Sequence, residues 1–284
     1  MQLVSDFLEA FRSCLLQLNP DQLLAMNMPD DITGWGITRE DDFNSLDSLY
    51  PRVQQRCQQQ ADIELEPLDA FGNGHAAVVI CQYKRKLALK SGNRIKDDNL
   101  RFSFYLVEAN GALKMRHAHL SKPWLAGLDW PNDPIPVRSD FGKPASPVRL
   151  NEAQMRPFIE HLQKRVAYTE STNVKGLASL QHHGNSNVFW PMQGAELRGN
   201  EQYRRYLEHL SEQYPSPFLK YYQPVVFQNH SLACLSAYAE VGYQTGRVLH
   251  TISPLRVSYF LQEQHGEWLC RHSHWSLPFG GRAF

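Results

Sequence analysis

The spacing of apolar residues changes near residue 61, and it predicts different structures on the two sides of that point. Before it, Leu3, Phe7 and Phe11 recur at helical intervals. After it, apolar and polar residues alternate, and the Asn110-Gly111 pair is typical of a hairpin turn. The predicted elements of this half are helices at 3–18, 22–26 and 41–60, a short strand at 32–36, and strands at 61–68, 76–89, 100–108 and 113–121. Helices followed by an antiparallel sheet indicate an α+β fold.

The second half of the chain shows the same order of patterns. An amphipathic helical pattern begins at Leu150, and a second change of period precedes residue 219. The predicted elements are helices at 150–168, 174–183 and 199–214, a short strand at 187–191, and strands at 219–228, 232–245, 249–263 and 267–277. This half is therefore predicted to be a second α+β domain.

A repeated motif connects the two halves. The pattern R-H-x-H-x-S-x-P occurs at residues 116–123 and again at 271–278, an offset of 155 residues (His274 against His119). The same offset relates Trp35 to Trp190 and Arg101 to Arg256. We therefore predict a duplicated domain, with the first repeat at 1–123, a proline-rich linker at 124–149 and the second repeat at 150–284.

Composition limits the function classes. Lys plus Arg equals Asp plus Glu at 29 each, so the net charge of zero gives no reason to expect a nucleic-acid or membrane partner. The five cysteines form no C-x-x-C pair, and the N-terminus lacks the pattern of a secretory signal, so a cytoplasmic protein with reduced thiols is expected. P-loop, G-x-S-x-G and dinucleotide-binding motifs are absent from the sequence, and no cofactor is expected.

The motifs of the second half resemble a known family. Residues 197–203 (LRGNEQY) and the G-x-W-x-x-x-H-x-H-x-S pattern at 266–276 are similar to the association domain of calcium/calmodulin-dependent protein kinase II, a branch of the nuclear transport factor 2-like (SnoaL-like) superfamily. The resemblance covers roughly 3–123 and 150–278, and is weaker in the first repeat, where Leu113 replaces the Trp. It implies two cone-shaped domains, each a curved antiparallel sheet packed on about three helices and enclosing a pocket.

The resemblance also implies candidate ligand-binding residues. The pocket arginine of the family matches Arg101 and Arg256, and an arginine in a concave pocket suits a carboxylate. The alternative is an arginine that pairs with a glutamate on a sheet face. A second basic position of the family matches Lys84 but is Ala239 in the second repeat. The expected pocket is therefore more apolar, with aromatic walls from Trp35, Trp190, Tyr203 and Trp275, although Trp35 and Trp190 also suit a plain core.

The paired histidines favour a structural role. In an H-x-H strand both imidazoles lie on one face, as a metal site requires, but no third ligand stands at a recognisable spacing. Strand alternation places His117 and His119 opposite Leu120, and His272 and His274 opposite Trp275. We interpret all four as interface or hydrogen-bonded structural residues and predict no metal site.

These observations favour a non-catalytic protein that binds a small carboxylate or apolar ligand, or that acts as an assembly module. The two domains are expected to pack sheet to sheet, so that one chain imitates a family homodimer, and the sequence leaves a homo-oligomer open. The alternative is a cofactor-independent isomerase, lyase or cyclase acting in an apolar cone pocket. No catalytic residue can be named, because Glu108 and Glu263, the acids that recur in both repeats, flank hairpin turns.

Overall fold

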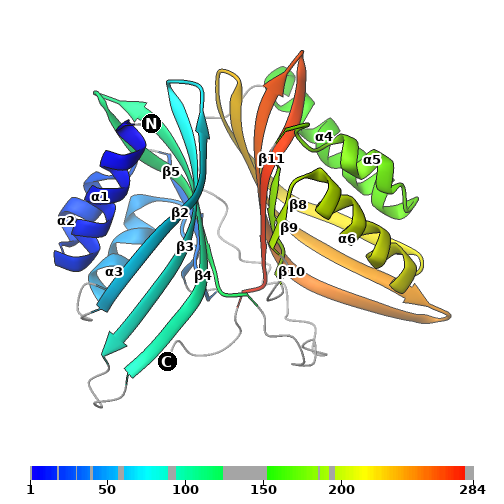
Figure 1. The fold of residues 1–284 in the computed structure, drawn as a ribbon, viewed down its shortest axis with the longest axis horizontal. Helices are drawn as coiled ribbons and strands as arrows, with labels where there is room; N and C mark the ends of the chain where they lie inside the picture. Colours follow the sequence, from blue (N-terminus) through cyan, green and yellow to red (C-terminus); the bar gives the residue numbers. More distant parts are fainter. Residues whose placement is uncertain are drawn as a thin grey trace. The chain divides into compact units, whose positions relative to one another are not determined.

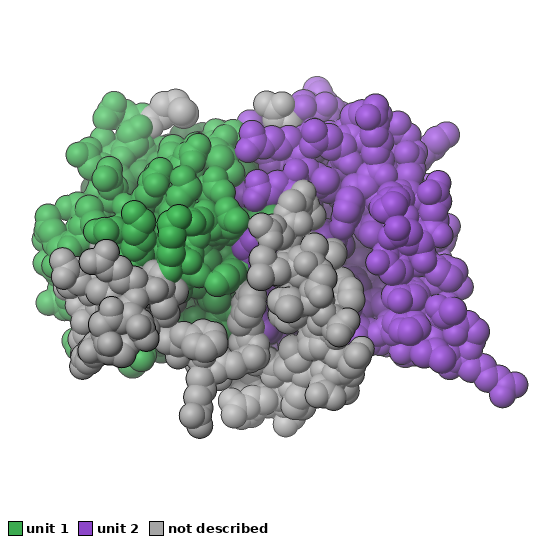
Figure 2. Space-filling view, turned by 60° about the horizontal axis from the view of Figure 1, so that its bottom comes forward, with its two compact units in different colours: residues 1–122, 142–148, 279–284 green, residues 123–141, 149–278 purple. Residues whose placement is uncertain are grey.

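A computed structural model describes residues 2–17, 19–29, 31–38, 41–56, 61–88, 94–123, 152–184, 186–191 and 196–278. The chain forms two compact units, which contain residues 1–122 and 149–278, respectively, together with short flanking segments (Figure 2). The predicted linker at 124–149 lies outside the described residues.

The first unit has a five-stranded sheet with its helices on one face (Figure 1). Its strand order is β1-β5-β4-β3-β2, with β1 parallel to β5 and the other neighbours antiparallel. Asn19 begins α2 by accepting a hydrogen bond from the Gln22 amide, and Pro20 follows where a missing N–H costs nothing. The elements are α1 (Gln2–Gln17), α2 (Pro20–Ala25), β1 (Thr33–Trp35), α3 (Leu46–Arg56), β2 (Ala61–Gly72), β3 (Ala76–Ala88), β4 (Arg94–Ala109) and β5 (Ala112–Ser121).

The second unit repeats this order and adds one short strand, so its sheet runs β7-β6-β11-β10-β9-β8. The added strand, β7, was not predicted from the sequence, and α5 ends earlier than predicted because Leu180 accepts a backbone hydrogen bond from Cys270 of β11. No described helix combines the length and apolarity needed to cross a membrane. The elements are α4 (Glu152–Glu170), α5 (Val174–Ser179), β6 (Asn187–Phe189), β7 (Glu196–Arg198), α6 (Asn200–Gln213), β8 (Pro217–Asn229), β9 (Leu232–Thr245), β10 (Val248–Gln264) and β11 (Glu267–Ser276).

The long strands of both units bend round their helices (Figure 1). Register shifts interrupt the ladders, and such bulges bend and twist a strand. One shift falls between Tyr105 and Leu106 in β4, and the matching shift falls between Phe260 and Leu261 in β10. The predicted α+β class with two repeated, curved sheets is therefore confirmed.

The repeat offset is not uniform along the chain. The helix caps Asn19 and Asn173 are 154 residues apart, although the last strands match at 155. In the pairing of β1 with β5, Trp35 is opposite His119. In the equivalent pairing of β6 with β11, Phe189 is opposite His274. Phe189, and not Trp190, is thus the structural counterpart of Trp35, because the two repeats differ by one residue between β1 and the long strands.

Candidate functional site

The strand arginines lie on the sheet face turned away from the helices. Arg256 is directly opposite Ser276, whereas its neighbour Val257 is opposite Trp275. Directly opposite residues share a face, and Val257 and Trp275 belong to the core that includes residues of α4. Arg101 occupies the same outer face in the first unit. The predicted inward orientation of Arg101 and Arg256 is therefore wrong, because strand alternation places both arginines on the face opposite the core residues Phe102 and Val257.

Two other predicted pocket residues also lie elsewhere. The ring of Trp35 meets the rings of His117 and His119 edge-on at centroid distances of 5.5 and 5.0 Å, and so shares the outer face with them. The Lys84 ammonium is 3.4 Å from the Glu64 carboxylate, in a partly exposed ion pair between β3 and β2. Neither residue faces the helices as a wall of the pocket would.

Three predicted residues do meet on the inner side of the second unit. Trp190 packs on Trp275 with ring centroids 5.1 Å apart, and Trp275 and Tyr203 are both buried in the core of this unit. The three aromatic residues thus lie together in the second unit, and their role as walls of a pocket stays a prediction. What the sequence did not predict is the polar group in the same interior.

The paired histidines make structural contacts. Nδ1 of His117 lies 2.8 Å from the Thr33 hydroxyl, and Nδ1 of His272 lies 3.0 Å from the Asn187 carbonyl oxygen. Complete burial lowers the pKa of His117 to about 3, so this imidazole is neutral at ordinary pH. Within the described residues, no group of three or more His, Cys, Asp or Glu side chains is arranged to hold a metal ion.

A buried arginine lies in the interior of the second unit. Arg165 of α4 is 3% exposed, and its guanidinium stacks over the Tyr259 ring at 4.2 Å from the centroid. Its Nε donates a hydrogen bond of 2.9 Å to Nε2 of His161, one helical turn earlier. Burial, assisted by the charge of Arg165, holds the pKa of His161 well below its usual range, so this histidine accepts as a neutral ring.

Hydroxyl and amide groups complete the surroundings of this arginine. The hydroxyl oxygens of Tyr221 and Tyr259 are 2.5 Å apart, and burial raises the pKa of both phenols. Burial also raises the pKa of Tyr203, an effect opposed by Arg165, and its hydroxyl interacts with both Arg165 and Gln181. We refer to these side chains as the Arg165 cluster, which comprises His161, Arg165, Gln181, Tyr203, Tyr221 and Tyr259.

The Arg165 cluster leaves strong hydrogen-bonding atoms unused. Nη2 of Arg165 is buried and has no hydrogen-bond partner, and Oε1 of Gln181, a residue that is 0% exposed, also has none, whereas the Gln181 amide interacts with the Tyr203 hydroxyl. A buried donor or acceptor without a partner costs about 1–3 kcal/mol, and more when it is charged. The unpaired guanidinium nitrogen makes the Arg165 cluster the candidate site of this unit.

Among the described residues from 152 to 278, no buried carboxylate accompanies this cation. The sequence contains no aspartate after Asp140, and none of the ten glutamates from Glu152 to Glu267 is buried. A buried cation is normally paired with an anion, because removing it from water is expensive. Within this described part of the chain, the Arg165 guanidinium therefore has no carboxylate partner.

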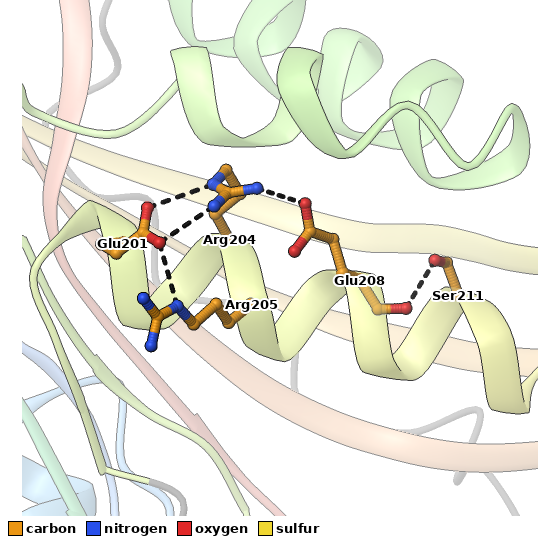
Figure 3. Close-up of polar contacts among 5 residues, drawn as sticks. All are labelled: Glu201, Arg204, Arg205, Glu208 and Ser211. Carbon is orange, nitrogen blue, oxygen red and sulfur yellow. Dashed lines mark hydrogen bonds and ion pairs between the residues drawn. The ribbon is translucent and has the colours of Figure 1, made fainter.

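Helix α6 supplies Tyr203 to the cluster and keeps its charges on the other side. Tyr203 is buried, while Arg204 bonds Glu201 at 2.9 Å and pairs with Glu208 (Figure 3). Arg205 also bonds Glu201 at 2.9 Å, and these hydrogen bonds lower the pKa of that carboxyl. Such pairs, three and four residues apart, stabilise a helix whose inner face carries Tyr203.

The sequence contains one signal for this site, on the first helix of the second unit. Phe158, Leu162 and Arg165 follow helical spacing on one apolar face of α4, and His161 lies on the same face. A charged residue on a buried helix face is unusual unless it is paired or functional. Burial of this position could not be known before the helix was placed on the sheet.

Comparison with known proteins places the fold among solved structures. No family model matches the chain, and no curated protein matches it. A protein from Xanthomonas campestris, provisionally named a calcium/calmodulin dependent protein kinase II association domain, is 15% identical, with 42% of this chain and 84% of that chain covered and a TM-score of 0.38. An NTF2-like protein of unknown function from Pseudomonas putida KT2440 is 16% identical, covering 47% and 93%, with a TM-score of 0.41. A protein from Novosphingobium aromaticivorans, provisionally named a scytalone dehydratase, is 13% identical, covering 46% and 91%, with a TM-score of 0.40.

Proposed function

We propose that the second unit binds a small organic anion in its interior and does not transform it. The observation that supports this proposal is the buried Arg165, whose Nη2 has no partner and which finds no buried carboxylate among the described residues from 152 to 278. A ligand carboxylate would supply the missing charge and accept the free N–H groups. The aromatic rings of Trp190, Trp275 and Tyr259 would exclude water and strengthen that pair.

The catalytic alternative requires a proton-transfer group that this interior does not offer. Isomerases with an apolar pocket use a carboxylate base, and no glutamate of this unit is buried. His161 is not free to act as a base, since Nε2 accepts from Arg165 and the ring also bonds the Trp268 backbone. Binding without chemistry is therefore the function that the Arg165 cluster supports best.

The first test compares two arginines on the same helix. We expect the full chain to bind benzoate in isothermal titration calorimetry, and Arg165→Met to weaken that binding by about 30-fold or more, the equivalent of a lost charged hydrogen bond. The matched control is Arg156→Met, because Arg156 is also on α4 but its side chain is 79% exposed. The control should bind benzoate within about twofold of wild type.

Two results would contradict the proposal. Equal loss of affinity in both variants would mean that general charge, and not this buried guanidinium, attracts the ligand. Conversion of the bound compound during prolonged incubation, followed by NMR, would refute the non-catalytic part of the proposal.

A further inference from the structure

The Arg165 guanidinium offers a ligand only part of its hydrogen-bonding fork. Nε donates to His161, and the Tyr203 hydroxyl also interacts with the guanidinium, whereas Nη2 has no partner. A bidentate bond to a carboxylate uses two parallel N–H groups, one for each oxygen. Arg165 can therefore hold one oxygen of a ligand carboxylate, and the other oxygen requires a second donor.

The same interior contains a hydroxyl group that can be this donor. The hydroxyl oxygens of Tyr221 and Tyr259 are 2.5 Å apart, and neither hydroxyl forms another hydrogen bond with a described residue. The pair has two O–H groups, but only one of them can lie between the two oxygens. One phenol O–H of the pair is therefore left to donate elsewhere.

The remaining O–H does not serve the hydrogen bonding of Arg165. The guanidinium stacks over the face of the Tyr259 ring, 4.2 Å from its centroid, and a guanidinium has no acceptor atom for a hydroxyl proton. The interior thus holds an N–H group and an O–H group that cannot bond each other. Two such donors suit a molecule with two acceptor oxygens, which a carboxylate has.

The first unit lacks both the hydroxyl pair and the buried arginine. By strand pairing, Phe104 takes the place of Tyr259, and Leu65 takes the place of Tyr221. The helix position of the arginine is occupied by Phe11, whose ring lies 5.1 Å from that of Phe104. The same sheet therefore forms without these hydroxyl groups, and they accompany the buried cation.

On the basis of the proposed anion binding, we infer that Tyr259 is a second ligand-binding residue, whose hydroxyl donates to the carboxylate oxygen that Arg165 does not hold. Tyr259 makes this contact because it is fully buried against the guanidinium, whereas Tyr221 is only partly buried. Tyr221 is a positioning residue, which donates to the Tyr259 oxygen and so directs the other proton toward the ligand. The ligand is a carboxylate whose two oxygens both accept hydrogen bonds, with an apolar body beside Trp275.

The test compares benzoate with thiobenzoate in isothermal titration calorimetry of the full chain. Both probes are ionised near neutral pH, but thiobenzoate has a sulfur atom, a weak acceptor, in place of one oxygen. We expect wild type to bind benzoate about 10-fold more tightly than thiobenzoate. Tyr259→Phe should weaken benzoate binding by about 10-fold and bring the two probes to within about twofold, because one oxygen then has no donor.

Two further variants separate the roles of the tyrosines. Tyr221→Phe keeps the Tyr259 donor and removes only the group that directs it, so benzoate binding should weaken by about threefold and the preference over thiobenzoate should remain. Tyr222→Phe is the matched control, because Tyr222 is the next residue of β8, is 43% exposed and bonds the Glu240 carboxylate at 3.0 Å. The control should bind both probes as wild type does. Circular dichroism of Tyr259→Phe distinguishes loss of folding from loss of recognition.

The outcomes distinguish this inference from the proposed function. Arg165-dependent binding of benzoate that Tyr259→Phe leaves unchanged overturns the role of Tyr259 only. A preference for benzoate over thiobenzoate that persists in Tyr259→Phe also overturns it, as do equal losses of affinity in Tyr259→Phe and Tyr222→Phe. Absence of benzoate binding to wild type, or binding that Arg165→Met does not change, overturns the proposed function itself.

Discussion

Two equivalent positions on the first helix are apolar in the first unit and polar in the second. In the first unit, Phe7 lies 5.6 Å and Phe11 lies 5.1 Å from the ring of Phe104. In the second unit, His161 lies 6.1 Å and the Arg165 guanidinium lies 4.2 Å from the ring of Tyr259. Each pair is separated by four residues on the first helix of its unit, so both side chains face the sheet in the same way.

The residues around these two positions also differ in polarity between the units. The first unit encloses Phe11 with Phe102 and Phe104 at centroid distances of 5.7 and 5.1 Å, and Met115 belongs to the same core. The second unit has Tyr259 and Cys270 at the positions of Phe104 and Met115. One copy of the fold thus has a dry aromatic core, and the other has a polar interior around a cation. Duplication allows one unit to supply stability while the other accepts the unfavourable burial of a cation.

The largest expected effect comes from moving the cation into the apolar unit. Phe11→Arg would place a guanidinium among Phe7, Phe102 and Phe104 without a polar partner. An uncompensated buried charge costs about 3–5 kcal/mol, so we expect the free energy of unfolding of this unit to fall by that amount in urea titration. Glu9→Arg adds an arginine to the exposed side of the same helix and serves as the control, with an expected change below about 0.5 kcal/mol.

If Phe11→Arg left the free energy of unfolding unchanged, the first unit would also accommodate a buried cation. That result would contradict the claim that only the second interior is suited to a cation. The converse change, Arg165→Met in the second unit, should have a smaller effect on stability than Phe11→Arg. It removes a buried charge, but it leaves Nε2 of His161 without its donor.

The fold was predictable from the sequence, whereas the candidate site was only partly so. Periodicity and the repeated R-H-x-H-x-S-x-P motif predicted both sheets, because alternation and hairpin signals act locally. Trp190, Tyr203 and Trp275 were correctly placed together. Arg101, Arg256 and Trp35 were assigned to the wrong face, because a strand fixes alternation but not which side meets the helices. Arg165 was missed because its burial depends on how α4 packs against β10.

A second, smaller effect is a dependence of stability on pH that arises from one buried histidine in each unit. His117 in the first unit and His161 in the second both have a lowered pKa in the folded state, the first to about 3. The unfolded chain binds a proton near pH 6.5 that neither buried ring accepts, so stability is complete above that pH and falls as the pH decreases toward the folded-state pKa. Each histidine should contribute about 1.4 kcal/mol per pH unit below roughly pH 6.

Urea titrations at several pH values between about 6.5 and 4.5 measure this dependence. His161→Gln keeps an acceptor for Arg165 and should reduce the slope by up to about one proton, and His117→Gln should do the same in the first unit. In Arg165→Met the slope due to His161 should decrease, because a neighbouring positive charge that lowers its pKa is removed. An unchanged slope in His161→Gln would mean that this ring is protonated in the folded unit, contrary to its role as an acceptor.

The smallest expected effect exchanges the two amides. Asn27→Gln lengthens the side chain that now bonds the Leu23 carbonyl and should weaken that contact, lowering the stability of the first unit by about 1 kcal/mol. Gln181→Asn allows the bond to α5 that Asn27 makes to α2, and should raise the stability of the second unit by a similar amount. Thermal unfolding of the two variants at one pH compares these changes directly. Opposite signs are expected because the Asn27 amide bonds its preceding helix and the Gln181 amide does not; a loss of stability in both variants would show instead that Gln181 is a structural residue.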